Sequence, residues 1–439
     1  MADLTKRPED RAPTSGGVDL TRSAPAPQAG RYAQFTYTSF DATTAGGAVA
    51  PGQRGHGGGW QVKQVLGNLD PAYVDELAAR IVTRFDLEPP LPGFPTPEQI
   101  VGRPARLSYV ATAGPTGWRG AYWHTVDAGR DGSGRPGNVF AHILADAHSD
   151  ADGRPIDLWR WSGWLAPYGP DEVKAAELAE PMPPRAANPA LSNPAVIAFL
   201  LDPGHDRVSV LRVLLDAVSA RLSGEAAGPA ALAVDFVDAA AHDRAAVWIA
   251  AVSSLLTPIG ARRFCWSTHE SPEAVAGGAA ADLHLVAVPK NRVGDVAGQV
   301  VVVDEHEEPY LGDPGSEHRV AAGVVPATPL SVLAEAVFAD EHTARRVLAR
   351  RDEVAAQFET DGSPALAPEW PLAVAVLEIP ELAEFHEDAA EVVVDDAPDG
   401  VEQVAWARDL VGGTLASRPP TPDAAMRRLG RAHRRGRGT

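Results

Sequence analysis

Six side chains that can bind a metal ion or transfer a proton lie within 25 residues of this chain: His124, Asp127, Asp131, His142, Asp146 and His148. Imidazole and carboxylate groups together can hold a divalent cation and activate water. Their spacing matches no established metal motif, and the last two belong to the polar stretch ADAHSDADG. We therefore predict no metal and no other cofactor. A metal-dependent hydrolase centred on His124, Asp127 and His142 stays open as an alternative.

A Pro-Gly pair predicts a tight turn over residues 134–138. Gly137 can adopt a positive φ in such a turn, and Asn138 can hydrogen-bond to nearby backbone. We expect Arg135 at the surface of the turn, within reach of Asp131. Its guanidinium could hold a carboxylate or phosphate of a partner by two parallel hydrogen bonds, or it could pair with an aspartate and fix loops together.

The residues that follow the turn, NVFAHILADAH, are predicted to form a strand, because the Pro-Gly pair and the β-rich segments around them favour one. In a strand His142 shares a face with Phe140 and Leu144, since side chains alternate between the two faces. Phe140 then enters the core, and His142 is buried and hydrogen-bonded. This arrangement favours a structural role for the imidazole over a catalytic one.

Three tryptophans, Trp159, Trp161 and Trp164, stand close together in DLWRWSGWLAPYG. Leu158 and Leu165 in the same segment favour packing in a core or between domains, where each indole N–H needs a partner. The alternative is an exposed platform on which a sugar, a nucleotide or a peptide stacks. The chain would then be a small-ligand or peptide sensor.

The sequence contains no Gly-x-x-x-x-Gly-Lys-Ser/Thr loop, no Gly-x-Ser-x-Gly elbow and no His-Glu-x-x-His motif. An enzyme is therefore the less favoured class. Asp235 and Asp238 follow an apolar strand, where acids line many α/β sites, but capping of the next helix is favoured. His269 and Glu270 have the same position after another strand and the same two interpretations.

Changes in composition along the chain divide it into five parts: a disordered segment 1–30, an α+β domain 31–185, an α/β domain 190–325, a mainly helical region 326–415 and a basic disordered tail 416–439. The Pro-rich stretch 180–194 is the expected linker between the two larger domains. The fold class is therefore a multidomain α+β and α/β protein.

The second domain has continuous apolar strands such as AALAVDFV and DLHLVAVP between helical patterns, which indicates a sheet covered on both faces. ARRFCWSTH is expected to be another strand of this sheet. Two helices are predicted over PLSVLAEAVFADEHTARRVLARRDEVAAQF, and the β-branched run AEVVVDDA is expected to form a strand.

The net charge is −19 and Cys265 is the single cysteine, so nucleic acid is an unfavoured partner and an internal disulfide is impossible. The N-terminus is polar, and no run of about 18 apolar residues occurs. We expect a cytoplasmic protein that does not bind membranes. The sequence does not specify an oligomeric state.

Several motifs occur together in one order: FTYTSFD, GGGWQVKQ, LPGFPTPEQI, YWHTVDAGRDGSGRPGNVFAHIL and RPIDLWRWSGWLAPYGPDEV. They resemble the N-terminal domain, type 2, of the bacterial GTPase-associated protein 1 family. DRAAVWIAAVSSLLTP and RRFCWSTHE resemble the middle domain of that family. The resemblance covers residues 31–325.

The resemblance implies an accessory protein that acts with a separately encoded GTPase in a bacterial conflict or signalling system, and it supplies no catalytic residues. The segment from Arg130 to Asn138, together with His142, lies in the most distinctive motif, which implies a domain-defining turn or a partner surface. A non-enzymatic, partner-binding protein is thus the first hypothesis. The candidate partner- or ligand-binding residues are His124, Asp127, Arg130, Asp131, Arg135, Asn138, His142, Trp159, Trp161 and Trp164.

Overall fold

A computed structural model of the chain describes residues 32–40, 59–84, 91–112, 119–147, 153–180, 182–183, 188–359 and 365–417. Segment 1–30, predicted to be disordered, and all but the first two residues of the tail 416–439 lie outside the described residues. His148 lies outside them as well.

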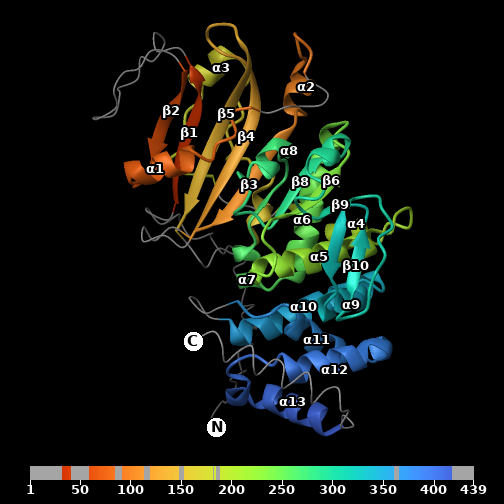
Figure 1. Cartoon of the computed structure of the whole chain (residues 1–439). Coiled ribbons are helices and arrows are strands. Elements are labelled where there is room, and N and C mark those ends of the chain that lie inside the picture. The colour runs from red at the N-terminus through yellow and green to blue at the C-terminus, as the bar shows by residue number, and fades with distance from the viewer. Residues whose placement is uncertain are drawn as a thin grey trace, which may run out of the picture.

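The centre of the molecule is a nine-stranded mixed sheet (Figure 1), in which the strands follow the order β2-β1-β5-β4-β3-β7-β8-β6-β9. Its first half is antiparallel and comprises β1 (Tyr32–Phe40), β2 (Gly59–Leu66), β3 (Ala105–Ala111), β4 (Gly120–Arg130) and β5 (Pro136–Asp146). Its second half is parallel and comprises β6 (Ala230–Val234), β7 (Trp266–Ser267), β8 (Leu285–Pro289) and β9 (Val302–Asp304). The predicted mixed α/β class is confirmed.

Helices cover both faces of the sheet. One face packs against α3 (Pro170–Ala175), α4 (Asn193–Leu200), α5 (Arg207–Leu222), α6 (Ala239–Leu255) and α7 (Pro258–Arg263). The opposite face packs against α1 (Pro71–Ala78) and α8 (Pro272–Ala276). Alternate residues of β6 enter the two cores, Leu232 on one side and Ala233 on the other, as a strand buried on both faces requires.

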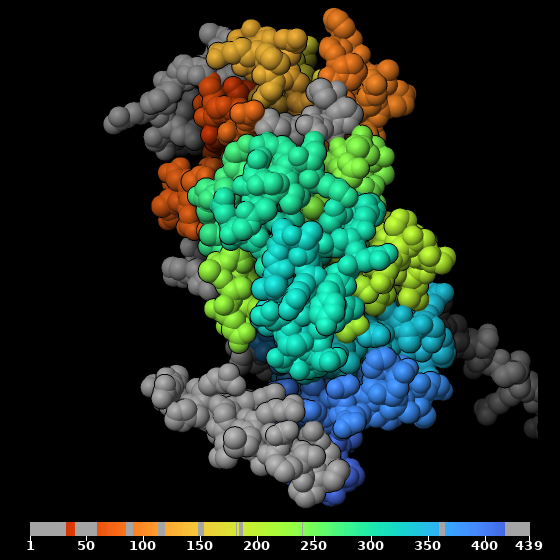
Figure 2. Space-filling view, turned by 45° about the vertical axis from the view of Figure 1, so that its right-hand side comes forward, coloured from red at the N-terminus to blue at the C-terminus, as the bar shows by residue number. Residues whose placement is uncertain are grey.

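A helical layer lies below the sheet, coloured blue in Figures 1 and 2. It consists of α9 (Pro329–Val337), α10 (Glu341–Phe358), α11 (Glu369–Leu377), α12 (His386–Asp395) and α13 (Ala405–Ser417). The strand expected at AEVVVDDA is wrong, because most of these residues belong to α12. Ala389, Val392 and Val393 recur at helical spacing and are buried, so packing overrides the β-preference of the valines.

The two halves of the sheet meet where β3 pairs with β7 over two residue pairs. Thr268 donates its backbone N–H to the Leu107 carbonyl, and its hydroxyl oxygen accepts from the Leu107 N–H at 2.9 Å. Beside them Arg106 of β3 forms an ion pair with Glu270, and both side chains are buried. The linker predicted at 180–194 stays a prediction, but strands from both sides of it share one sheet.

Two further features of the described structure lie outside the central sheet and the helices that cover it. A small sheet of β10 (Glu317–Val320) and β11 (Gly323–Pro326) packs near α5, where His318 hydrogen-bonds to Asp216 at 2.9 Å with both side chains fully buried. At the end of the molecule farthest from α13, the short helix α2 (Pro97–Val101) projects beside the end of β4 (Figure 1).

Candidate functional site

The turn between β4 and β5 is built by Asp131. The Asp131 carboxylate accepts hydrogen bonds from the Ser133 N–H, the Ser133 hydroxyl and the Arg135 N–H, at 2.7–2.9 Å. Two backbone hydrogen bonds close the turn: the Gly134 N–H donates to the Asp131 carbonyl, and the Asp131 N–H donates to the Arg135 carbonyl. The prediction of a turn over 134–138 is therefore wrong by about three residues, because a side chain rather than the Pro-Gly pair forms the turn.

The residues predicted around this turn lie mostly as expected. The Arg135 side chain is 81% exposed and 3.7 Å from Asp131, which confirms its surface position. Arg130 is exposed and donates to the Gly134 carbonyl at 2.8 Å. Gly137 has a φ of 80°, as predicted. Asn138 is buried, and its side-chain oxygen accepts from the Ser39 N–H at 3.3 Å, which ties β5 to β1.

Both imidazole nitrogens of His142 are hydrogen-bonded. Nδ1 accepts from the Leu165 N–H at 3.1 Å, so the proton is on Nε2, which donates to the side-chain oxygen of Gln34 at 3.0 Å. Burial lowers the pKa of His142 to about 3. The side chain is thus buried and hydrogen-bonded, as predicted, and burial keeps it neutral.

His124 faces His142 across the β4–β5 pair and stacks on Trp164, with ring centroids 5.1 Å apart. Burial, with a smaller effect of the neighbouring His142, lowers the pKa of His124 well below its usual value. Asp127 is half-buried and accepts from the Gly129 N–H at 2.8 Å. Within the described part of the chain, no three His, Cys, Asp or Glu side chains are grouped so that they could hold a metal ion.

The three tryptophans are buried, which confirms the packing interpretation. Trp161 and Trp164 meet edge to face with centroids 5.2 Å apart. Trp159 donates its indole N–H to Asp243 at 2.7 Å, and Trp164 donates to the Leu158 carbonyl at 2.7 Å. Their faces are therefore occupied by the core between β4, β5 and the helices rather than open to a ligand.

The acidic residues after the apolar strands also have structural roles. Asp238 accepts from the Ala241 N–H at 3.0 Å and caps α6, as predicted. Glu270 belongs to the buried ion pair with Arg106. His269 is buried, and burial lowers its pKa to about 3, with His242 and Arg106 adding to the effect.

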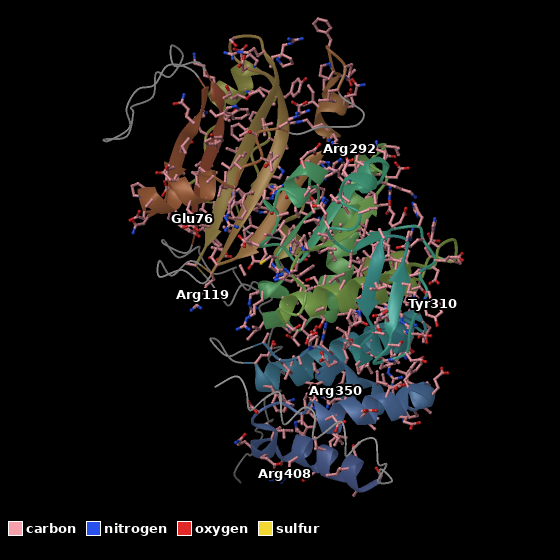
Figure 3. All side chains as sticks on the ribbon, in the orientation of Figure 1. Glu76, Arg119, Arg292, Tyr310, Arg350 and Arg408 are labelled. Atoms are coloured by element: carbon pink, nitrogen blue, oxygen red, sulfur yellow. The ribbon has the colours of Figure 1, made fainter. Side chains whose placement is uncertain are left out.

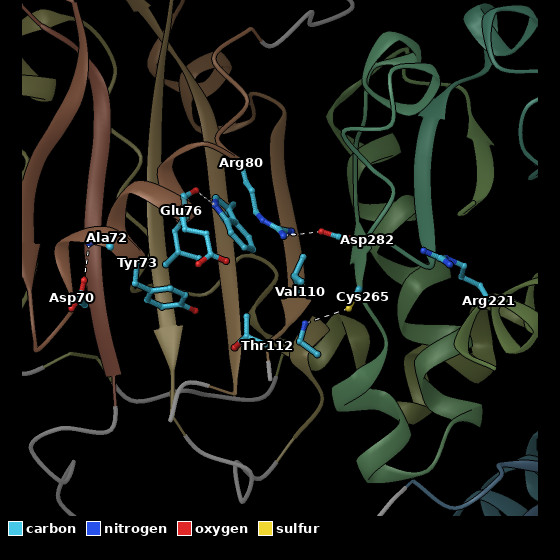
Figure 4. Close-up of a pocket in the computed structure, with 13 residues that line it drawn as sticks. Asp70, Ala72, Tyr73, Glu76, Arg80, Val110, Thr112, Arg221, Cys265 and Asp282 are labelled. Carbon is cyan, nitrogen blue, oxygen red and sulfur yellow. Dashed lines mark hydrogen bonds and ion pairs between the residues drawn. The ribbon is translucent and has the colours of Figure 1, made fainter. Parts of the chain in front are cut away.

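A cleft of about 580 Å³ lies between α1 and the junction of the two sheet halves (Figure 4). Arg80 and Asp282 form an ion pair of 2.7 Å beside it, and Arg221 donates to backbone carbonyls. Cys265 also lines the cleft, and burial raises the pKa of its thiol to about 11. A protonated thiol is a poor nucleophile, and the two arginines already have partners.

Two exposed apolar residues near α2 are not among the candidate binding residues that the sequence predicts. Phe94, just before α2, is 98% exposed, and Val101 at the end of α2 is 78% exposed. The sequence signal was an aromatic residue between Gly93 and Pro95 in a stretch without periodic apolar neighbours. A side chain in such a place has no segment of its own against which to pack.

Comparison with known proteins identifies the N-terminal part of the chain. Residues 31–182 match the family described as GTPase-associated protein 1, N-terminal domain type 2, so the chain carries this domain. The match ends at residue 182, and the middle domain expected over 190–325 stays a prediction.

Two curated relatives come from Mycolicibacterium smegmatis, strains MKD8 and ATCC 700084 / mc(2)155, and each is named "Putative ESX-1 scaffolding and assembly protein SaeB". The chain is 38% identical to the first over 395 residues, which are 88% of the chain and 44% of the relative. For the second it is 38% identical over 400 residues, 90% of the chain and 45% of the relative. The chain thus spans less than half the length of these proteins. No solved structure matches it.

No helix in the described part of the chain combines the length and the apolar composition needed to cross a membrane.

Proposed function

We propose that this chain is a non-enzymatic accessory protein that binds a separately encoded GTPase and helps to hold a multi-protein assembly together. The match of residues 31–182 to a GTPase-associated domain carries the proposal. The relatives named as scaffolding and assembly proteins of ESX-1 support it, and they suggest a secretion system as the setting. A conflict or signalling system remains the other setting for the same role.

The site geometry supports a binding role over a catalytic one. His124, His142 and Trp164 contact one another inside the core, and the hydrogen bonds of His142 hold neighbouring segments. The exposed residues of the same motif, Arg130 and Arg135, lie on a turn where they can meet another protein. Charged side chains at such positions contribute to orientation and to the rate of association.

The test uses the purified full chain and the purified GTPase encoded beside it. We expect a stoichiometric complex in analytical ultracentrifugation, and we expect calorimetry of the chain alone with GTP and magnesium to show no saturable heat, because the sequence lacks a phosphate-binding loop. Absence of a complex in both the GDP and the GTP state of the GTPase would refute the proposal. Micromolar binding of GTP by the chain alone would also refute its accessory role.

A further inference from the structure

The segment around α2 is exposed to an unusual degree. None of the residues of α2 is buried, and two large apolar side chains of this segment, Phe94 and Val101, are exposed to solvent, whereas Ile100 is half-buried. Removing apolar surface from water is what stabilises most folded segments, and this segment gains almost nothing from it. Its conformation therefore needs another source of stability.

That source is a set of hydrogen bonds that fix both ends of α2. Thr96 and Gln99 form a reciprocal capping box at the start of the helix. At its end the buried Arg103 donates to the carbonyls of Ile100, Asp127, Ala166 and Pro167, at 2.5–3.2 Å. The hydrogen bonds of Arg103 thus attach the end of α2 to β4 and to the segment before α3. Phe94, just before α2, and Val101, at its end, are exposed on this attached segment. A backbone segment fixed in this way loses little conformational entropy when it binds a partner.

The turn between β4 and β5 lies at the same end of the molecule, as Figures 1 and 2 show. Tyr168 connects the two features: its ring contacts Arg103, and Gly129 packs closely against it. Burial raises the pKa of Tyr168, Asp127 adds to the rise, and the nearby charges of Arg103 and Arg130 oppose it.

The outward charge of the β4–β5 turn is positive. The Asp131 side chain is only 13% exposed and its carboxylate is occupied within the turn, whereas Arg130 and Arg135 are exposed. This end of the molecule therefore carries an exposed aromatic side chain and two exposed guanidinium groups. A complementary surface has an apolar pocket next to carboxylates.

We infer that Phe94, Val101, Arg130 and Arg135 form the docking surface for the GTPase of the proposed function, on which this inference rests. All four residues lie within the part of the chain, 31–182, that matches the GTPase-associated domain. A second copy of this chain is a poorer occupant, since two molecules of net charge −19 repel each other. Phe94 enters an apolar pocket of the GTPase, and the arginines meet carboxylates at the rim of that pocket.

The experiment compares full-chain variants for binding to the purified GTPase encoded beside the chain. Phe94→Ala should weaken binding about 30-fold, as removal of an anchoring aromatic does. The double variant R130E/R135E should slow association, and more strongly at low salt than at high salt. Tyr310→Ala is the matched control, because Tyr310 is 66% exposed but lies beside β10, far from α2 (Figure 3), and it should change binding less than twofold.

Each outcome has a defined meaning. All variants should keep the unfolding temperature of the wild type, since none of the replaced side chains is buried. If the wild type binds and Phe94→Ala binds equally well, the docking surface is refuted while the proposed function stands. If the wild type does not bind the GTPase, the proposed function fails and the docking surface fails with it. A self-association of the wild type that Phe94→Ala abolishes would assign the surface to a second copy and overturn the inference.

Discussion

His142 is a side chain with the chemistry of a catalyst and the surroundings of a structural residue. Its two nitrogens join β5 to Gln34 of β1 and to the Leu165 backbone, and its ring is nearly perpendicular to that of Trp164, with the ring centroids 5.1 Å apart. Alternation along the strand was enough to predict its burial. The hydrogen-bond partners, which come from distant positions of the chain, could not be predicted from local sequence.

Phe140 and Arg135 lie only five residues apart but should respond oppositely to truncation. Phe140→Ala should lower the free energy of unfolding by about 3–5 kcal/mol, because the ring is fully buried in the core. Arg135→Ala should leave the unfolding temperature nearly unchanged, because its side chain is largely exposed. Urea and thermal unfolding measure both effects. A loss of more than about 2 kcal/mol for Arg135→Ala would show that the turn depends on its guanidinium.

The exposed residues at the end of the molecule show what sequence reasoning could not supply. Arg135 was placed correctly, because a turn is a surface feature wherever it lies. The exposure of Phe94 is not predicted, although the motif that contains it, LPGFPTPEQI, is one of those that carry the family resemblance. An aromatic residue in a proline-rich stretch can be buried by any other part of the chain, so its exposure is decided by the whole fold.

At the scale of elements, the contact between β3 and β7 depends on few backbone pairs and on one buried ion pair. Glu270→Gln should therefore destabilise the protein by about 3–5 kcal/mol, since it leaves the Arg106 guanidinium buried without its counter-charge. The double variant R106M/E270M should recover more than half of that loss, because it removes both charges and retains apolar volume. Urea unfolding of the two variants measures the difference. Equal losses in both would show that packing rather than charge joins the strands.

The elements were predicted unevenly. The strand of residues 136–146 and the helices α5, α6, α9 and α10 carry patterns that depend on their own residues. ARRFCWSTH, in contrast, contains only the two strand residues of β7, because α7 extends to Arg263 and the strand ends at Ser267. The β-branched run AEVVVDDA lies mostly in α12 rather than in a strand, since its valines pack against α9 and α11.

At the scale of the whole molecule, buried histidines make stability depend on pH. Burial lowers the pKa of His142 and of His269 to about 3 and that of His242 to about 4. In the unfolded chain histidine titrates near pH 6.5, so below that pH the unfolded state binds protons that the folded state does not. Stability is complete above about pH 6.5 and falls as the pH falls toward 4.

Each of these histidines should contribute a loss of about 2 kcal/mol between pH 7 and pH 5. Urea unfolding at the two pH values measures the total, and His242→Phe should reduce that total by about 2 kcal/mol. His342→Phe is the control, because His342 is exposed and should leave the pH dependence unchanged. Equal stability of the wild type at pH 7 and pH 5 would contradict the assignment of these histidines as buried neutral bases.

The continuity of the sheet across β3 and β7 has a consequence for recombinant production of the matched domain. A fragment comprising residues 31–182 would retain β3 but lose β7, so the backbone N–H and C=O groups on one side of an apolar strand would become available to other molecules. We expect this fragment to precipitate or to form soluble oligomers at concentrations where the full chain does not, as size-exclusion chromatography with light scattering would show. A monodisperse, monomeric fragment would mean that the domain protects this strand by itself. If the fragment aggregates, residues 31–182 are the extent of the family match but not a unit that can be expressed alone.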